Sequence, residues 1–304
     1  LVCAGKTYPQ TDGVHADRSN PANRSGPSVG QRVNQLLFLA LHATPLALFY
    51  IEINLLDWAL CAGLYGLRMF GVTAGYHRYF SHRAFRTGRF FQFCLAVLAQ
   101  SAAQKGVLWW AANHRRHHAA SDTIHDVHSP VQRGFWYAHL GWWFGNDHNK
   151  TDLSLVKDFS AYPELRWLDR YHVLPFLGLA LITFWIGGWS GLVVGFLLST
   201  LLLFHATLAI NSIGHMWGGR RFSTRDASRN NPVLALLTLG EGWHNNHHYF
   251  PSAARQGFHP LEIDVTYVVL RFLALTGLVY DLKPLPDRIL RDMRAPHSGN
   301  PAAL

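Results

Sequence analysis

Histidine is the residue whose number and spacing point to chemistry in this chain. Of 304 residues, 19 are histidine, and two segments share the pattern His-x-x-His-His: His114-Arg-Arg-His117-His118 and His244-Asn-Asn-His247-His248. On a helix, positions i, i+3 and i+4 lie on one face, so each segment can direct three imidazoles toward one place. Neutral imidazole is a common ligand of transition metals. The two segments therefore predict metal ligands.

Two further histidine groups directly follow apolar stretches. His77 and His82 are about 140° apart on a straight helix, so they converge only at a helix end or a bend, or they serve two metals. His215 closes the segment that begins at Asn211, and a single histidine is more often an ordinary hydrogen-bonded residue than a ligand. Together the four groups supply nine histidines. That number exceeds the three or four ligands of a zinc ion and favours a site for two transition metals.

Other residue types narrow the kind of site. The three cysteines, Cys3, Cys61 and Cys94, contain no Cys-x-x-Cys pair, which excludes a disulfide scaffold, a thiolate zinc site and a cysteine-ligated iron–sulfur cluster. Soluble di-iron bundles use Glu and Glu-x-x-His ligands, whereas Glu241 is the acid closest to these patterns along the chain. We therefore expect an all-histidine metal site.

A polar segment that follows the first triplet offers supporting residues. It contains His125, Asp126 and His128 within four positions. Side chains of these types commonly orient metal-bound imidazoles by accepting or donating hydrogen bonds behind them. We expect these three residues to support the ligands without binding the metal themselves.

Apolar stretches predict an all-α membrane protein with four spans, at residues 36–51, 55–74, 173–189 and 191–210. Residues 173–210 contain no Asp, Glu, Lys or Arg, and as one helix they would measure about 57 Å, twice a hydrocarbon core of about 30 Å. We expect that segment to turn at the glycines of residues 187–191. The shorter apolar stretch at 90–98 predicts an interfacial or buried helix.

Charge gives the orientation of these spans. The net charge is +9, and the arginines border the predicted spans on one side, which places both termini and the two long polar segments in the cytoplasm. A nucleic-acid-binding protein would instead gather basic residues into a stripe or a known motif. Residues 1–30 predict a disordered polar leader without the apolar core of a signal peptide, residues 31–285 the membrane domain, and residues 286–304 a C-terminal tail.

A metal site at the cytoplasmic ends of spans two and four lies where a long apolar chain could enter from the membrane. Cleaving an aliphatic carbon–hydrogen bond is beyond side-chain acid–base chemistry, so such a substrate requires a redox metal that activates oxygen. Binding along the chain would then select the carbon that is presented to the metal.

At these residues the sequence resembles the membrane fatty acid desaturases, specifically bacterial-like members of the delta-9, stearoyl-CoA type. The resemblance covers roughly residues 50–285 and rests on four segments: Gly71-Val-Thr-Ala-Gly-Tyr-His77-Arg-Tyr-Phe-Ser-His82-Arg, Asn113-His114-Arg-Arg-His117-His118, Asn211-Ser-Ile-Gly-His215 and Gly240-Glu-Gly-Trp-His244-Asn-Asn-His247-His248-Tyr-Phe-Pro251. It implies a four-span helical fold whose cytoplasmic cap holds two irons on the nine histidines. It also implies that Asn211 reaches one iron through a water and that Thr207 lines the acyl tunnel.

The resemblance also implies the reaction and its partners. A cis double bond, at the delta-9 position, is inserted into a saturated acyl chain with dioxygen and two electrons. The chain has no His-Pro-Gly-Gly haem motif or flavin fingerprint, so a separate ferredoxin or cytochrome b5 type donor with its reductase is expected. The bacterial inner membrane is the expected location, and acyl-CoA is preferred to acyl-lipid as substrate. Asn113 stands where animal acyl-CoA enzymes usually have an acid, which leaves the headgroup contacts open.

Two alternatives remain open from the sequence. A hydroxylase of the same di-iron superfamily shares the first hydrogen abstraction, although alkane hydroxylases typically have Glu-containing histidine patterns that are absent here. A metal transporter is the non-enzyme alternative, but transport requires ligands along a path within the spans. His42 and His205 are the histidines that fall inside the predicted spans.

Overall fold

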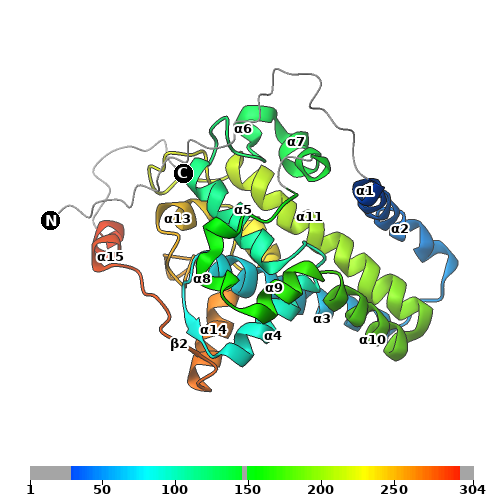
Figure 1. The fold of residues 1–304 in the computed structure, drawn as a ribbon. Helices are drawn as coiled ribbons and strands as arrows, with labels where there is room; N and C mark the ends of the chain where they lie inside the picture. Colours follow the sequence, from blue (N-terminus) through cyan, green and yellow to red (C-terminus); the bar gives the residue numbers. More distant parts are fainter. Residues whose placement is uncertain (1–28, 146–148, 295–304) are drawn as a thin grey trace.

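The structure, a computed structural model, describes residues 29–145 and 149–294 (Figure 1). Its regular structure there is almost entirely helical, as predicted. The strands found in these ranges, β1 (Arg86–Thr87) and β2 (Val279–Tyr280), form one short antiparallel pair. The predicted disordered leader, residues 1–30, lies almost entirely outside the described residues. The predicted tail contains α15 (Asp287–Arg294) before the described part of the chain ends.

Two helical runs among the described residues are long and apolar enough to cross a membrane, Leu55–Ser81 and Leu174–His215. The first consists of α3 (Leu55–Phe70) and the π-helix η3 (Gly71–Ser81). It begins in a capping box, because the Asn54 side chain accepts hydrogen bonds from the first turn while the Asp57 carboxylate accepts one from the Asn54 backbone. This run covers the predicted second span and ends at the first histidine pair.

The second run contains α10 (Leu174–Ser190), the π-helix η6 (Gly191–Leu198), α11 (Ser199–Ser212) and the 3-10 helix η7 (Ile213–His215). It is interrupted at Gly188, which has φ 60° and ψ −151°. Glycine adopts this conformation readily because it has no Cβ. The chain therefore turns within the predicted segment 187–191, and α10 packs beside η6.

The predicted first span is not one helix. α1 (Val29–Leu41) ends just before His42, and the chain continues as α2 (Thr44–Ala47) and the 3-10 helix η2 (Leu48–Tyr50). Pro45 explains the break, because proline has no backbone N–H and is tolerated only in the first turn of a helix. Four membrane-crossing helices are thus not confirmed by helix length, since two runs pass that criterion.

A buried arginine joins the two long runs. Arg68 lies in α3, its side chain is fully buried, and its guanidinium donates hydrogen bonds to the hydroxyls of Ser199 and Thr200 in α11. It also donates to the Leu64 carbonyl on its own helix. A charged group among apolar helices requires such partners because an unpaired charge there is very unfavourable.

The apolar stretch at 90–98 forms α4 (Arg89–Gln100), and one face of this helix packs on η3. Two glycines of η3 allow the close contact. A Cβ on Gly71 would lie 2.8 Å from Leu98 Cγ and 3.0 Å from the backbone nitrogen of Ala99, and a Cβ on Gly75 would lie 3.2 Å from the Leu95 carbonyl oxygen. The position of η3 is therefore fixed by glycine packing against α4.

The remaining helices surround the ends of η3 and α11. Figure 1 shows α10 at one end of the molecule and α13 and α15 at the opposite end. Two of these helices carry the histidine triplets, α5 (Val107–Ala120) and α13 (His244–Tyr249). The others are α6 (Pro130–Arg133), α7 (Phe135–His139), η4 (Gly141–Phe144), η5 (Leu153–Val156), α8 (Lys157–Ser160), α9 (Pro163–Arg170), α12 (Pro232–Leu237) and α14 (Val265–Leu275).

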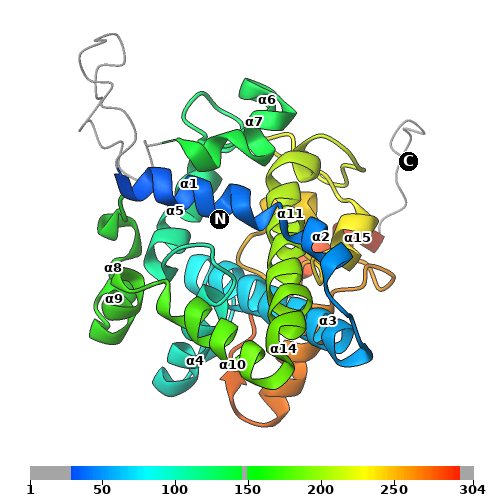
Figure 2. The same cartoon turned by 90° about the vertical axis from the view of Figure 1, so that its right-hand side faces the viewer.

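A chain of three imidazoles connects α1, α11 and α7. His42 Nε2 lies 3.0 Å from His205 Nε2, and His205 Nδ1 lies 3.1 Å from His139 Nε2. At its ends, His42 Nδ1 is 2.8 Å from the Phe38 carbonyl oxygen and His139 Nδ1 is 3.0 Å from the Ser212 hydroxyl. Figure 2 shows α1 running across the helices toward α11, where this chain attaches it.

Candidate metal centre

The nine predicted ligands converge in two adjoining groups. Within each group, one nitrogen from every ring lies within 4.8 Å of the others. We call them the five-histidine group and the four-histidine group. The first contains His77, His82, His114, His118 and His247; the second contains His117, His215, His244 and His248.

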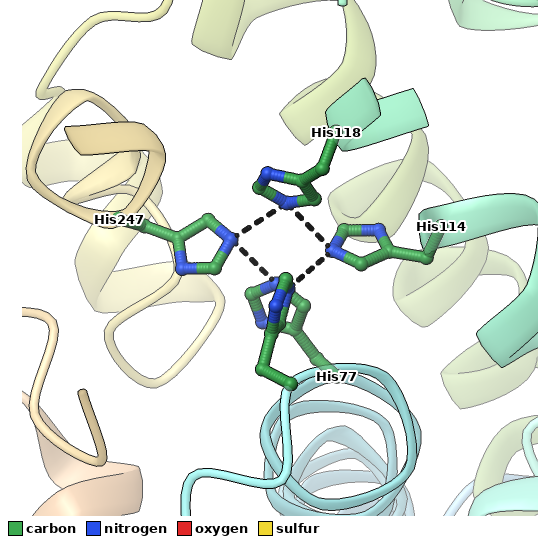
Figure 3. Close-up of side chains that lie close together, drawn as sticks. His77, His114, His118 and His247 are labelled. Carbon is green, nitrogen blue, oxygen red and sulfur yellow. Dashed lines mark hydrogen bonds between the residues drawn. The ribbon is translucent and has the colours of Figure 1, made fainter. Parts of the chain in front are cut away.

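The five-histidine group surrounds one small volume with Nε2 atoms. Four Nε2–Nε2 distances are 3.0 Å for His77–His247, 2.9 Å for His118–His247, 3.0 Å for His114–His118 and 2.8 Å for His82–His114. Figure 3 shows four of these imidazoles with their nitrogens turned toward one another. Ligands at right angles around one ion, with bonds of about 2.1 Å, are separated by about 3.0 Å.

Hydrogen bonding alone does not account for this arrangement. Each imidazole nitrogen carries either one proton or one lone pair in the ring plane, so it can make one good hydrogen bond. Yet Nε2 of His118 faces both His114 and His247, and Nε2 of His247 also faces His77. A cation that accepts all the lone pairs satisfies these nitrogens together, so the donor set fits a bound metal.

The π-helix explains how the His77 and His82 pair reaches one place. The His82 N–H donates to the His77 carbonyl at 3.2 Å, an i+5 hydrogen bond. This wider turn brings positions i and i+5 onto the same side of the helix, whereas a straight α-helix would separate them. The two ring centroids are 4.9 Å apart, and both residues belong to the five-histidine group.

Each triplet divides between the two groups instead of converging as a unit. In α5, His114 and His118 join the five-histidine group and His117 the four-histidine group, while α13 places His247 in the first and the pair His244 and His248 in the second. Positions i and i+4 are only about 40° apart on a helix, but i+3 and i+4 differ by about 100°. The middle histidine of each triplet therefore faces the neighbouring group.

The two groups are close neighbours. The ring centroids of His118 and His248 lie 4.4 Å apart, although they belong to different groups. Within the four-histidine group, His215 Nε2 is 3.0 Å from His244 Nε2. The arrangement provides two adjacent positions for metal ions, with five and four imidazoles.

Carboxylates stand behind the four-histidine group. Both carboxylate oxygens of Asp126 lie 3.1 Å from His117 Nδ1. Two other aspartates each accept from an Nδ1 through one oxygen, at 2.8 Å for Asp122 with His215 and 2.7 Å for Asp226 with His248. Such a carboxylate holds the proton on Nδ1 and leaves the Nε2 lone pair free for a metal.

Sequence reasoning anticipated one of these carboxylates. It expected Asp126, and it expected His125 and His128 beside it. The structure places the His128 ring 4.4 Å from His117, while His125 is exposed. Asp226 was missed, because it is an isolated acid in a polar loop and carries no recognisable spacing signal. Asp122, in the same segment as Asp126, could have been found from its proximity to the triplet.

The five-histidine group has one carboxylate neighbour of its own. Glu241 lies against His77 Nδ1, and Arg78 donates to the same carboxylate at 3.0 Å. Burial raises the pKa of the Glu241 carboxyl, but His77 and Arg78 outweigh burial and hold that pKa below its ordinary value. The acid closest to the histidine patterns is therefore ionised and stands behind a ligand.

Burial favours the neutral form of six of the nine imidazoles, those of His82, His114, His118, His244, His247 and His248. Removal from water, reinforced by the neighbouring rings, holds the pKa of His114, His118 and His247 well below the ordinary value. The same causes, with burial the largest and Asp226 partly opposing it, lower the pKa of His248 to about 4. Neutral imidazole is the form that binds metal, so these side chains are ready ligands at neutral pH.

A small cavity of about 60 Å³ adjoins this centre. Its lining includes His114, Asn211 and Thr207, so the two predicted residues of α11 share a wall with a histidine of the five-histidine group. Gln104 Nε2 donates to Thr207 Oγ1 at 3.0 Å, and Trp110 Nε1 donates to Gln104 Oε1 at 3.2 Å. Gln104 and Trp110 were not predicted as site residues, because they lie outside the histidine patterns.

A larger cavity of about 440 Å³ lies next to the first. The two share Trp143 and Phe204, and the lining of the larger one is mostly apolar and comes from α1, α10 and α11. Lys105 also lines it. Its ammonium group donates to the Asn149 side chain at 2.6 Å. A mostly apolar space with one lysine in its lining thus leads toward the metal centre.

Comparison with known proteins agrees with this site. Residues 54–264 match the fatty acid desaturase family. An sn-1 stearoyl-lipid 9-desaturase of Anabaena variabilis is 34% identical over 260 residues, which cover 83% of this chain and 93% of the relative. An icosanoyl-CoA 5-desaturase of Limnanthes douglasii is 36% identical over 255 residues, covering 82% and 71%. With nine histidines gathered as two possible metal positions, this chain belongs to the fatty acid desaturase family.

Proposed function

We propose that this desaturase inserts a cis double bond at the delta-9 position of a saturated acyl chain, using two iron ions held by the nine histidines. The observation that carries the proposal is the division of nine imidazoles into groups of five and four beside a cavity lined by Thr207 and Asn211. Nine nitrogens suit two transition metals, and Asn211 would add a water-mediated contact to one of them.

The overall reaction is balanced by dioxygen together with electrons and protons that come from outside the protein. The saturated acyl chain and dioxygen, with two electrons and two protons, give the alkene and two waters. Iron at this site would supply the activation of dioxygen that removal of hydrogen from an unactivated carbon requires. The electrons come from outside, and we propose a ferredoxin or cytochrome b5 type donor with its reductase.

The protein's own residues orient and enclose the substrate. The aspartates behind His117, His215 and His248 fix which ring nitrogen faces the metal. Thr207, which accepts a hydrogen bond from Gln104, forms part of the wall that the acyl chain would follow past the five-histidine group. The mostly apolar lining of both cavities excludes water from that path.

We further propose where the double bond is placed and which carrier holds the acyl chain. Position nine is supported by the relatives whose names specify a 9-desaturase, including one from Synechocystis that is 37% identical over 218 residues. Those relatives are named for acyl-lipids, whereas the Limnanthes relative is named for an acyl-CoA. We retain acyl-CoA as the predicted carrier and acyl-lipid as the alternative that the experiment decides.

We also propose a four-span arrangement with the termini and the metal centre in the cytoplasm of a bacterial cell. The turn at Gly188 divides the run Leu174–His215 into two apolar segments. Leu55–Ser81 supplies another segment and the apolar helices within 35–50 the first. Many side chains on these segments are large, apolar and exposed, for example Trp185 at 87% and Leu181 at 70%, as expected for contact with lipid.

The proposed activity is tested with purified, iron-loaded protein. We expect stearoyl-CoA, dioxygen and a reduced donor to yield the cis-9 alkene, identified by mass spectrometry after derivatisation of the double bond. A parallel assay with a stearoyl lipid in bilayers decides the carrier. An alcohol product would identify a hydroxylase instead, and ion uptake into liposomes without any product would identify a transporter.

Metal content provides a separate test of the ligand assignment. We expect about two irons per wild-type chain and a lower content with no turnover in His118→Ala, because one ligand of the five-histidine group is lost. His259→Ala is the matched control, since this exposed histidine lies outside both groups and outside the segment expected to support the ligands. Full iron content in His118→Ala would contradict the assignment.

A further inference from the structure

Gln256 is a buried residue that neither the histidine patterns nor the cavities identify. It lies in the segment between α13 and α14, and only 1% of it is exposed. Its backbone is held at both polar groups: the N–H donates to Asp264 Oδ2 at 2.7 Å, and the carbonyl accepts from Asn246 Nδ2 at 3.0 Å. These two hydrogen bonds fix the position of the Gln256 backbone, and with it the direction in which the side chain extends.

That side chain contacts two histidines from different helices. Gln256 Nε2 lies 3.2 Å from Nδ1 of His77, which is in η3, and 3.4 Å from Nδ1 of His247, which is in α13. The Nε2 atoms of the same two rings face each other at 3.0 Å. One amide group thus touches the rear nitrogen of two rings whose front nitrogens meet in the five-histidine group.

The chemistry of metal-bound imidazole decides which amide atom belongs there. A neutral ring that gives its Nε2 lone pair to a metal carries its proton on Nδ1, and this N–H needs an acceptor. His77 has the Glu241 carboxylate as one acceptor. For His247 Nδ1, the contact found within the described residues is the Gln256 side chain.

Gln256 can supply the acceptor through its oxygen. Within the described residues, Gln256 Oε1 is buried and has no hydrogen-bond partner, which is an unfavourable state for a polar atom. The oxygen and nitrogen of an amide exchange places by rotation of the group through about 180°. That rotation sets Oε1 opposite His247 Nδ1 and gives the buried oxygen a donor, while His77 Nδ1–H keeps the Glu241 carboxylate as its acceptor.

We propose that Gln256 is a positioning residue of the five-histidine group, and that its side-chain oxygen accepts a hydrogen bond from Nδ1–H of His247. The inference rests on the proposed binding of metal through Nε2. The Gln256 amide lies behind one ligand from η3 and one ligand from α13, so it relates the orientations of the two rings.

An ion-pair network holds Gln256 in register with those ligands. Asp264, which accepts from the Gln256 backbone, also binds Arg78 at 2.9 Å. Arg78 binds Glu241 at 3.0 Å, and Glu241 contacts His77. The contacts form a closed loop that begins and ends on His77, so the Gln256 backbone is bound to the same buried carboxylate network that contacts this ring.

The experiment compares metal retention in three variants. Gln256→Met keeps a similar volume but removes the amide acceptor, whereas Gln256→Glu keeps an acceptor oxygen. Gln100→Met is the matched control, because Gln100 is also a fully buried glutamine but bonds to backbone groups of residues 107 and 168. Folding of each variant is checked by size exclusion and circular dichroism in detergent.

We expect Gln256→Met to bind one of its two metals about 10- to 100-fold more weakly than wild type, which is the usual cost in affinity of removing a hydrogen-bond partner behind a ligand. The weaker binding should appear as faster release of that metal to a chelator. Gln256→Glu and Gln100→Met should retain both metals at the wild-type rate or more slowly. The measurement uses cobalt as well as iron, because the visible absorption of cobalt reports loss of a ligand independently of activity.

The possible outcomes separate this inference from the proposed function. Wild-type retention in Gln256→Met, or equally rapid loss in a folded Gln256→Glu, would overturn the role of the acceptor oxygen. If Gln256→Met does not fold, Gln256→Glu alone still decides, since it must hold metal at least as well as wild type. Failure of wild-type protein to bind two metals would instead refute the proposed function.

Discussion

Lys105 is a basic residue in an unusually apolar position. It lines the larger cavity, and its ammonium group lies 4.2 Å from the centroid of the Trp109 ring. Burial lowers the pKa of this lysine from 10.5 to about 8. Lys105 is therefore charged below about pH 8 and becomes neutral above it, within a range that enzyme assays can reach.

This titration gives a prediction for substrate binding. If Lys105 contacts an anionic acyl carrier, KM for stearoyl-CoA should rise as the pH is raised from 7 to 9, because the attracting charge is lost. The expected change is about fivefold, corresponding to about 1 kcal/mol for a partly exposed ion pair. Lys105→Arg should bind with a flat pH profile, since arginine stays charged. A flat profile in wild type would show that Lys105 does not contact the carrier.

The residue scale also shows what the sequence could predict about the site. The two His-x-x-His-His segments were predicted as metal ligands from their spacing, because ligands on a helix need spacings such as i and i+4. His77, His82 and His215 were weak candidates by spacing, and the resemblance to the family added them. The division of His117 and His118 between two groups was not predicted, because it depends on where α13 sits relative to α5. Asp226 and Gln256 were missed for a related reason: they contact ligands through the fold and not through any sequence spacing.

At the scale of elements, η3 determines whether the first histidine pair can bind one metal. Its wider turn brings His77 and His82 together, and its packing on α4 depends on glycine. The sequence predicted a span over residues 55–74 followed by the pair, with a bend as one of the possibilities. It could not predict a π-helix, because that geometry is stabilised by contacts with neighbouring helices.

The packing of η3 gives a prediction for stability. In Gly71→Val, a Cβ would lie 3.0 Å from the backbone nitrogen of Ala99, so α4 must shift. We expect a loss of about 1–3 kcal/mol in stability, seen as a lower thermal midpoint in detergent, together with lower metal content. Gly63→Val in α3 is the control, because a Cβ there meets nothing within 4 Å. Equal behaviour of the two variants would show that this contact does not hold η3 in place.

At the scale of the whole molecule, α10 lies at one end and α13, which carries one histidine triplet, lies toward the opposite end (Figure 1). The sequence predicted the helical class and the position of the turn at Gly188, since apolar length and glycine are local signals. It overestimated the regularity of the first span, where Pro45 interrupts the helix. Hydropathy counts apolar residues and does not register such an interruption.

The proposed orientation in the membrane can be tested with single cysteines. In a variant whose native cysteines are replaced by alanine, Trp189→Cys should react with a membrane-impermeant maleimide added to intact spheroplasts, because this exposed residue follows the turn at Gly188. Arg220→Cys, exposed in the loop after α11, should react only after lysis. Labelling of Arg220→Cys in intact spheroplasts would place the metal centre on the other side of the membrane.

The imidazole chain between α1 and α11 has a direction that follows from one carbonyl group. Because the Phe38 oxygen can only accept, His42 Nδ1 must carry the proton, and in the neutral rings His42 Nε2 then accepts from His205. By the same logic His205 accepts from His139, and His139 accepts from the Ser212 hydroxyl. The Phe38 carbonyl at the end of α1 thus sets the tautomer of all three rings. If the hydrogen bond between His42 and this carbonyl were lost, all three tautomers could change, and the Ser212 hydroxyl could then accept a hydrogen bond from His139 instead of donating one.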